Sequence, residues 1–218
     1  MKVVEIFSSI EGEGKRQGEL STFIRLHGCN LSCAWCDTRY AWDEGSFYTE
    51  MNFDKIFNKC EEFGNVNITV TGGEPLIHDG IDDFLKVFSK IGKYNINVET
   101  NGSIPIGKRY ANIFYTIDCK MPSSGMTANM IPVKIGTSTI DGVRKSDAIK
   151  FVVADIQDLM FARTIIDTIF GPTIYIIPVY GTIGLDKIAQ FMKDNKMQRI
   201  RLQAQLHKQI WPGVDCGV

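Results

Sequence analysis

The stretch Cys29-Asn30-Leu31-Ser32-Cys33-Ala34-Trp35-Cys36 carries three thiols in the spacing C-x-x-x-C-x-x-C, just after the apolar run Phe23–Leu26. Three thiolates this close together can bind one metal centre, but they leave a four-ligand site one ligand short. A structural zinc requires a closed shell of ligands, so an open position points to chemistry at the metal. The stretch therefore predicts a metal centre with an exchangeable ligand at the end of a strand.

Two other interpretations of these thiols stay open. Clustered cysteines in an intracellular chain often form a zinc knuckle, which His27 or His78 would complete. A disulfide framework fits less well, because a chain of 218 residues needs no covalent staples and clustered thiols favour a reducing compartment. The remaining cysteines (Cys60, Cys119 and Cys216) are scattered singly and are expected to be packed or incidental thiols.

Composition bounds the class of protein. With 218 residues and 44% hydrophobic side chains, we expect a single domain over residues 1–218 with a sizeable core. A formal net charge of −1 provides no general field to capture nucleic acid. The segment Met1–Ile6 lacks signal-peptide anatomy, and the apolar stretch Ile174–Leu185 is interrupted and too short to cross a bilayer. These features predict a cytoplasmic protein without nucleic-acid or membrane partners.

Strand-like and helix-like segments alternate along the chain. Strands are expected at Lys2–Phe7, Ser21–His27, Val66–Val70, Asn95–Glu99, Ile113–Asp118, Ile149–Val153, Thr173–Pro178 and Arg199–Gln203. Helices are expected from Phe53 onward with Asn52 as the cap, and at Ile81–Ile91, Ile156–Ile169 and Leu185–Lys196, whereas 127–146 indicates loops with one short helix. This alternation predicts a parallel sheet with right-handed crossovers. About six βα steps are too few for a closed eight-fold barrel, so we expect an α/β fold with an incomplete (β/α) barrel.

Polar and glycine-rich segments follow several of these strands. They are Ser8–Gly14, Thr71-Gly72-Gly73-Glu74-Pro75, Thr100–Ser103 and Lys120–Gly125. Ligands bind at the carboxyl ends of parallel strands, and paired glycines let bare backbone approach a ligand. Arg25 alternates with Phe23 and His27 and carries a guanidinium suited to a carboxylate, provided that this face lines the barrel mouth.

The cysteine spacing, with Trp35 just before the last cysteine and Gly72-Gly73-Glu74-Pro75 downstream, resembles the radical S-adenosylmethionine (SAM) enzymes. That resemblance implies that three cysteines hold a 4Fe–4S cluster, whose fourth iron is chelated by SAM. The narrower pattern resembles 7-carboxy-7-deazaguanine synthase. It consists of Ser9–Gly14, Arg25 four residues before Cys29, Cys36-Asp37-Thr38, Lys120–Gly125 and the tail Gln205–Trp211. The ending Trp211–Cys216 departs from that family's more basic endings.

This resemblance implies an enzyme that converts 6-carboxy-5,6,7,8-tetrahydropterin to 7-carboxy-7-deazaguanine and ammonia in queuosine biosynthesis, with SAM used catalytically. It also implies Mg²⁺, a reductant such as flavodoxin or ferredoxin, and a homodimer. Residues carried over to the cluster and Mg²⁺ are Cys29, Cys33 and Cys36, with Thr38 for Mg²⁺. Those carried over to SAM are Trp35, Asp37, Gly72, Gly73, Glu74 and Ser123. Those carried over to the substrate are Ile10, Glu11, Gly12, Arg25, Thr71, His207 and Val218, with Arg25 on its carboxylate.

Two alternatives from other classes remain open. A radical-SAM activase that installs a glycyl radical in a partner protein would need an open face rather than the carboxylate clamp that Arg25 and Thr38 indicate. A non-catalytic iron–sulfur or zinc module would need no SAM-binding segments at separate strand ends.

Overall fold

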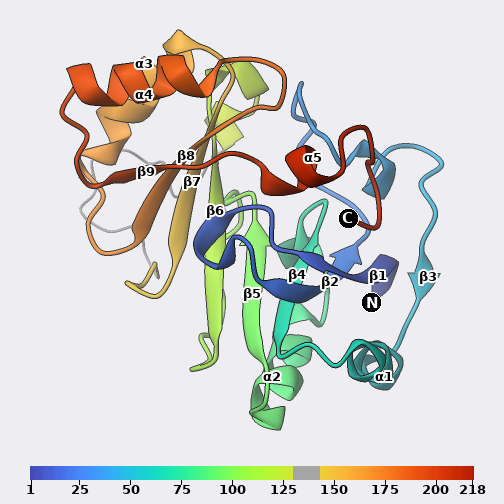
Figure 1. Cartoon of the computed structure of the whole chain (residues 1–218). Coiled ribbons are helices and arrows are strands. Elements are labelled where there is room, and N and C mark those ends of the chain that lie inside the picture. The colour runs from blue at the N-terminus through green and yellow to red at the C-terminus, as the bar shows by residue number, and fades with distance from the viewer. Residues whose placement is uncertain (130–142) are drawn as a thin grey trace.

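The described residues form one open, curved sheet with helices packed on it. The structure is a computed structural model that describes residues 1–129 and 143–218. Its nine strands follow the order β3-β1-β2-β4-β5-β6-β7-β8-β9, so β3 and β9 are edges and the described sheet does not close (Figure 1). The predicted incomplete barrel is confirmed.

The sheet is parallel from β2 to β9. The first strand departs from the expected parallel arrangement, because β1 runs antiparallel to both β2 and β3. No helical crossover joins β1 to β2, and without one the chain returns antiparallel. The strands are β1 (Lys2–Ile10), β2 (Leu20–Leu26), β3 (Thr49–Glu50), β4 (Asn67–Gly72), β5 (Asn95–Thr100), β6 (Ile113–Lys120), β7 (Ala148–Val153), β8 (Thr173–Pro178) and β9 (Ile200–Leu202).

The predicted helices are present, and local signals fix their ends. They are α1 (Phe53–Phe63), α2 (Ile81–Ile91), α3 (Ile156–Ile166) and α4 (Leu185–Asp194), followed by the short α5 (Leu206–Ile210). Asn52 caps α1 by accepting from the Lys55 amide, as predicted, and Gly64 ends that helix in the left-handed region. Asp155 caps α3 in the same way through the Asp158 amide. No helix among residues 1–129 and 143–218 is long and apolar enough to cross a membrane.

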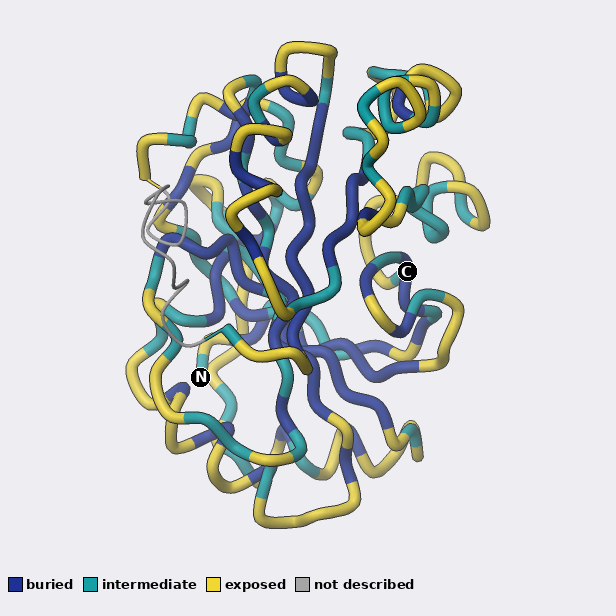
Figure 2. Tube along the Cα trace, turned by 90° about the vertical axis from the view of Figure 1, so that its left-hand side faces the viewer, coloured by how far each residue is buried: buried dark blue, intermediate teal, exposed yellow. Residues whose placement is uncertain are grey.

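Strand alternation separates the two faces of the sheet. The residues on one face form a single apolar cluster with buried side chains of α1 to α4. They include Ile24, Val70, Val98, Ile117 and Phe151. Figure 2 shows these buried strands at the centre, with exposed segments around them. The opposite face therefore carries the polar strand residues and lines the candidate site.

Several segments differ from the sequence-based expectation. Ser8–Ile10 continues β1 instead of beginning a loop, because these residues pair with Leu20–Thr22 of β2. The strand β3 and the helix α5 were not predicted. Of the loops expected at 127–146, Thr127–Asn129 forms a 3-10 helix, and 130–142 lie outside the described residues.

Candidate functional site

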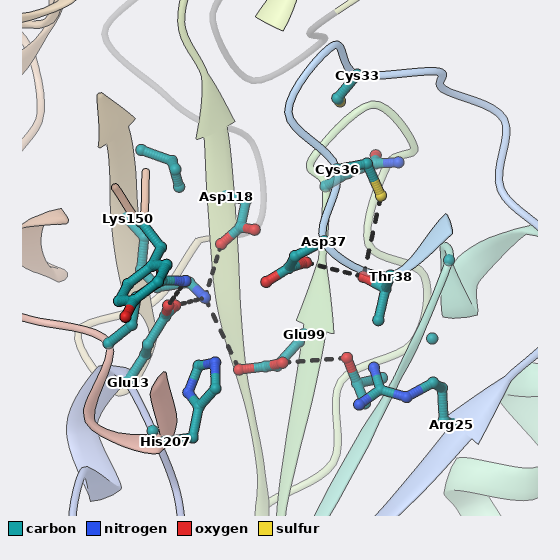
Figure 3. Close-up of a pocket in the computed structure, with 18 of the residues that line it drawn as sticks. Glu13, Arg25, Cys33, Cys36, Asp37, Thr38, Glu99, Asp118, Lys150 and His207 are labelled. Atoms are coloured by element: carbon teal, nitrogen blue, oxygen red, sulfur yellow. Dashed lines mark hydrogen bonds and ion pairs between the residues drawn. The ribbon is translucent and has the colours of Figure 1, made fainter. Parts of the chain in front are cut away.

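A cavity of about 360 Å³ opens at the carboxyl ends of the strands, on the polar face of the sheet. Its walls combine the loop after β1, the cysteine loop after β2, the ends of β4 to β7 and the C-terminal tail (Figure 3). Residues far apart in the sequence therefore meet in one place, with the first and last segments of the chain on the same cavity.

The floor of the cavity follows from strand register. Arg25 of β2 lies opposite Thr71 of β4, and Asp118 of β6 lies opposite Lys150 of β7. Residues opposite each other in neighbouring strands point to the same face, so these four side chains line the cavity together with Glu99 of β5. The Thr71 hydroxyl donates to Glu99 Oε2 at 3.0 Å, which links two of the strands.

Lys150 is the centre of an ion-pair network that the sequence did not reveal. Its Nζ lies 2.7 Å from Glu13 Oε2, 2.9 Å from Asp118 Oδ1 and 3.8 Å from Glu99 Oε1. Asp118 also accepts from Lys120 Nζ at 2.9 Å. The Lys150 side chain is only 5% exposed. The carboxylates around it therefore offset the free-energy cost of removing its ammonium group from water.

The same contacts set the protonation states in the cavity. Burial acts to raise the pKa of Asp118, but Lys120 and Lys150 outweigh it and hold that pKa at about 2. Burial acts to lower the pKa of Lys150, and Asp118, Glu13 and Glu99 outweigh it and raise that pKa well above its usual value. Asp118 is therefore ionised and Lys150 is protonated near neutral pH.

Arg25 has its predicted place on the cavity, and its contacts leave one end of the guanidinium unused. Its Nε donates to Glu5 Oε1 at 2.7 Å. The rings of Phe7 and Tyr40 each lie 5.7 Å from its guanidinium carbon. Among the described residues no acceptor takes a bond from either Nη, and the guanidinium points into the cavity in Figure 3. This geometry suits a carboxylate that binds both Nη groups.

The three cysteines of the 29–36 loop all line the cavity as free thiols. Cys29 Sγ accepts from the Leu31 amide at 3.4 Å, and Cys36 Sγ accepts from Trp42 Nε1 at 3.3 Å. Burial raises the pKa of the Cys33 thiol, and Lys120 opposes this.

The thiols are not yet gathered around one point. Within the part of the chain that the structure describes, no three His, Cys, Asp or Glu side chains form a metal-binding group. Cys36 Sγ turns toward the Thr38 hydroxyl in Figure 3, and that hydroxyl donates to Asp37 Oδ1 at 3.0 Å. The donor set of three soft thiol sulfurs on one cavity suits an iron–sulfur cluster, which Cys29, Cys33 and Cys36 would hold.

Two glycines at the end of β4 are sterically required. Gly72 has a φ of +148°, and a Cβ there would lie 2.1 Å from the Leu26 carbonyl oxygen. A Cβ on Gly73 would lie 2.1 Å from the Gly28 carbonyl oxygen. Only glycine permits this close contact between the end of β4 and the start of the cysteine loop, and both glycines line the cavity.

Glu74 is not among the residues that line the cavity, although Gly72 and Gly73 beside it are. Its buried carboxylate accepts from the Leu76 amide, the Thr100 hydroxyl and the Asn101 amide. These bonds join the ends of β4 and β5. The side chain therefore fixes the shape of the two strand ends.

Ser123 is half-buried and is not among the residues that line the cavity. Its hydroxyl donates to Asp158 Oδ2 at 2.5 Å and accepts from Trp35 Nε1 at 2.9 Å. The Trp35 ring also makes a cation–π contact, with Lys120 Nζ 5.2 Å from the ring centre. The Trp35–Ser123–Asp158 chain thus fixes the indole of the cysteine loop against α3.

The loop after β1 packs against the C-terminal tail. Glu11 is buried and accepts from Arg16 Nη2 at 2.9 Å and from the Thr69 hydroxyl. Burial and, to a smaller extent, Glu99 raise the pKa of Glu11 to about 7, and Arg16 opposes them. A Cβ on Gly12 would lie 1.9 Å from His207 Nδ1, so glycine allows α5 to cover this loop.

The tail closes one side of the cavity. Gln203 bonds both backbone groups of Gly14 at 2.9 Å, and Gln205 Nε2 donates to Glu13 Oε1 at 2.7 Å. His207 and Val218 line the cavity, together with Lys208, Val214 and Asp215. In Figure 1 the C terminus lies beside the loop that follows β2.

Most of the sequence-predicted site residues meet on this cavity. Those on it are Ile10, Glu11, Gly12, Arg25, Cys29, Cys33, Trp35, Cys36, Asp37, Thr38, Thr71, Gly72, Gly73, His207 and Val218, whereas Glu74 and Ser123 are not among its lining residues. Sequence reasoning gave no role to Glu13, Glu99, Asp118, Lys120 or Lys150. The available signal was a lysine inside the apolar strand Ile149–Val153, since a buried lysine needs an anionic partner.

Known proteins resemble the chain in sequence and in fold. Residues 23–116 match the family model described as the radical SAM superfamily. The chain is 43% identical to 7-carboxy-7-deazaguanine synthase of Clostridium acetobutylicum, with 96% of each chain covered. It is 35% identical to the enzyme of that name from Methanospirillum hungatei, covering 95% of this chain and 84% of the relative. The crystal structure of QueE from Escherichia coli has the same fold, with a TM-score of 0.70 at 21% identity over 94% of both chains.

Proposed function

Because the chain belongs to the 7-carboxy-7-deazaguanine synthase family, we propose that it converts 6-carboxy-5,6,7,8-tetrahydropterin to 7-carboxy-7-deazaguanine and ammonia. The chain is a radical SAM enzyme of 7-deazapurine biosynthesis, and the reaction proposed for it is that of a carbon–nitrogen lyase. The observation that carries this proposal is the position of Arg25, whose two Nη groups face the same cavity as the three cysteines.

The radical SAM superfamily implies a 4Fe–4S cluster and SAM as cofactors. Cys29, Cys33 and Cys36 would hold the cluster, which, together with SAM, supplies a carbon-centred radical for hydrogen abstraction from the substrate. The bare backbone of Gly72 and Gly73 would bind the polar end of SAM, and the Trp35 indole would pack near its adenine. Asp37, which lines the cavity next to Cys36 in the chain, would also contact SAM.

The substrate would occupy the floor of the cavity. Its carboxylate would bind the Nη groups of Arg25, and the Thr38 hydroxyl would serve as a ligand of Mg²⁺ beside that carboxylate. The N–H groups of the pterin edge need acceptors, which the segment Ile10–Gly12, Thr71 and Glu99 offer. His207 and Val218 of the tail would close the cavity and help to exclude water.

Three further assignments belong to the proposal. A small reductant such as flavodoxin or ferredoxin supplies the electron, and the enzyme works in the cytoplasm, where thiols stay reduced. The enzyme acts as a homodimer. An activase function is less well supported, because a tail over the cavity leaves little room for the loop of a partner protein.

Anaerobic binding and turnover with reconstituted protein test the proposal. We expect Arg25→Ala to weaken binding of the carboxypterin about tenfold or more, because a charge-assisted bond contributes roughly 1.5–3 kcal/mol, and to change SAM binding little. Cys33→Ala should abolish turnover, and Mg²⁺ should stimulate the wild-type enzyme. Equal losses of pterin and SAM binding in Arg25→Ala, or turnover by Cys33→Ala, would refute these assignments.

A further inference from the structure

Glu5 is a half-buried carboxylate of β1 that does not line the cavity and that the proposed function does not use. It accepts hydrogen bonds from three separate segments. Its Oε1 accepts from Arg25 Nε at 2.7 Å and from the Tyr40 hydroxyl at 2.8 Å. Its Oε2 accepts from the Gly217 amide at 3.1 Å.

Each of the three donors belongs to a different part of the site. Arg25 is on the floor of the cavity. Tyr40 follows two residues after Thr38, in the 3-10 helix Arg39–Ala41. Gly217 immediately precedes Val218, which lines the cavity from the tail. Glu5 therefore joins the floor, the loop that carries Thr38 and the end of the chain.

An irregularity in β1 places Glu5 where it can do this. Val3 pairs with Leu26 and Glu5 pairs with Arg25, so one extra residue, Val4, is accommodated in β1. Such a β-bulge re-aims the side chain that follows it. Without the bulge, Val4 would lie opposite Arg25 and Glu5 would lie opposite Ile24. The irregularity thus puts a carboxylate directly beside the guanidinium.

We propose that Glu5 is a positioning residue that orients Arg25 for its ligand and, through its second oxygen, holds the C-terminal tail over the cavity. The first half rests on the proposed function, because that function supplies the carboxylate ligand of Arg25. The second half rests on the contact with Gly217 alone.

The geometry explains how one carboxylate does both. Arginine offers donors at Nε and at the Nη pair, and Glu5 takes Nε, so the fork formed by both Nη groups stays available to a ligand. The rings of Phe7 and Tyr40 restrict the plane of the guanidinium. Since Tyr40 donates to the same oxygen as Arg25, a change in either contact alters the other.

The test compares Glu5→Gln with a matched surface variant, Glu50→Gln, in the reconstituted enzyme. Glu50 is exposed in β3 and pairs with Lys2 of β1. The substitution Glu50→Gln therefore removes one negative charge at the same edge of the sheet without altering a residue of the site. Backbone hydrogen exchange of residues 214–218 reports the tail, and anaerobic titrations report pterin and SAM binding.

We expect Glu5→Gln to speed hydrogen exchange in the tail about tenfold and to weaken pterin binding about tenfold, because the charge-assisted bonds are lost. SAM binding should change less than about twofold, which corresponds to well under 1.4 kcal/mol. Tyr40→Phe should weaken pterin binding by a smaller factor, and Glu50→Gln should change none of these quantities.

Unchanged tail exchange in Glu5→Gln would overturn the inference, as would equal losses of pterin and SAM binding. A folding defect would weaken the binding of pterin and of SAM alike, whereas a positioning role affects pterin binding alone. If the wild-type enzyme itself does not bind the carboxypterin, the proposed function fails, and the tail exchange of Glu5→Gln then decides the inference on its own.

Discussion

Lys150 is the residue on which the charges of the cavity depend. It is the counter-cation of Glu13 and a close partner of Asp118, and its side chain is buried. Breaking a buried ion pair by removing one partner costs more than the pair contributes, because the remaining charge is left without compensation.

Lys150→Met should therefore lower the free energy of unfolding near neutral pH by about 3–5 kcal/mol. In the wild-type protein the folded pKa of Asp118 is depressed to about 2, so its stabilising contribution is present above its unfolded pKa of 3.8 and is lost as pH falls toward 2. The penalty of Lys150→Met should shrink over the same range. Urea unfolding at several pH values measures this, with the exposed Lys145→Met as control. A penalty that does not depend on pH would contradict the ion-pair account.

Glu11 should give the wild-type protein an opposite pH dependence. Its pKa is raised from 4.5 to about 7, mainly by burial and then by Glu99, so between these values the folded state binds more protons than the unfolded state. Stability from this group is therefore greatest at low pH and falls as pH rises from 4.5 through 7, by about 3 kcal/mol in total.

Glu11→Gln should remove this loss. The free energy of unfolding of the variant, relative to the wild-type protein, should rise by about 3 kcal/mol between about pH 5 and about pH 8. Urea unfolding at both pH values measures the difference, and the exposed Glu19→Gln serves as the control. A constant difference between Glu11→Gln and the wild-type protein would show that Glu11 titrates normally.

At the scale of elements, local sequence patterns predicted most of the sheet and the helices. The period of apolar residues indicated α2 at Ile81–Ile91, and β8 at Thr173–Pro178 is likewise as predicted. In contrast, β3 and α5 are short, and their conformations depend on contacts with β1 and with the loop at Gly12. Tertiary contacts of this kind leave no periodic pattern in the sequence.

The Trp35–Ser123–Asp158 chain gives α3 a role in the site. Asp158 is fully buried and accepts from the Ser123 amide, the Ser123 hydroxyl and the Ala154 amide. Its loss leaves several buried donors without an acceptor, and it frees the segment that holds the Trp35 indole.

Asp158→Ala should therefore destabilise the protein by about 3 kcal/mol and weaken SAM binding several-fold. Thermal unfolding and an anaerobic SAM titration measure the two effects, and the exposed Asp167→Ala at the end of the same helix is the control. Should SAM binding survive unchanged in a folded Asp158→Ala protein, Trp35 does not depend on α3 for its position.

At the scale of the whole molecule, the site is made by the open curvature of the sheet and by the meeting of both chain ends. The motifs at the strand ends could be predicted from the sequence, because the cysteines, the paired glycines and Arg25 have recognisable spacing. The Lys150 network and the Glu5 contacts could not be predicted from the sequence, because strand register and a β-bulge bring those residues together. Glu74 and Ser123 belong to recognisable motifs, yet strand-end packing and Asp158 take up their side chains.

The most direct test of the central claim is the number of product molecules formed per SAM consumed in an anaerobic, reductant-driven reaction with the carboxypterin. If SAM acts as a cofactor beside a carboxypterin site, 7-carboxy-7-deazaguanine should exceed consumed SAM by about tenfold or more. Product that never exceeds one molecule per SAM, or SAM cleavage without any deazaguanine, would contradict the account.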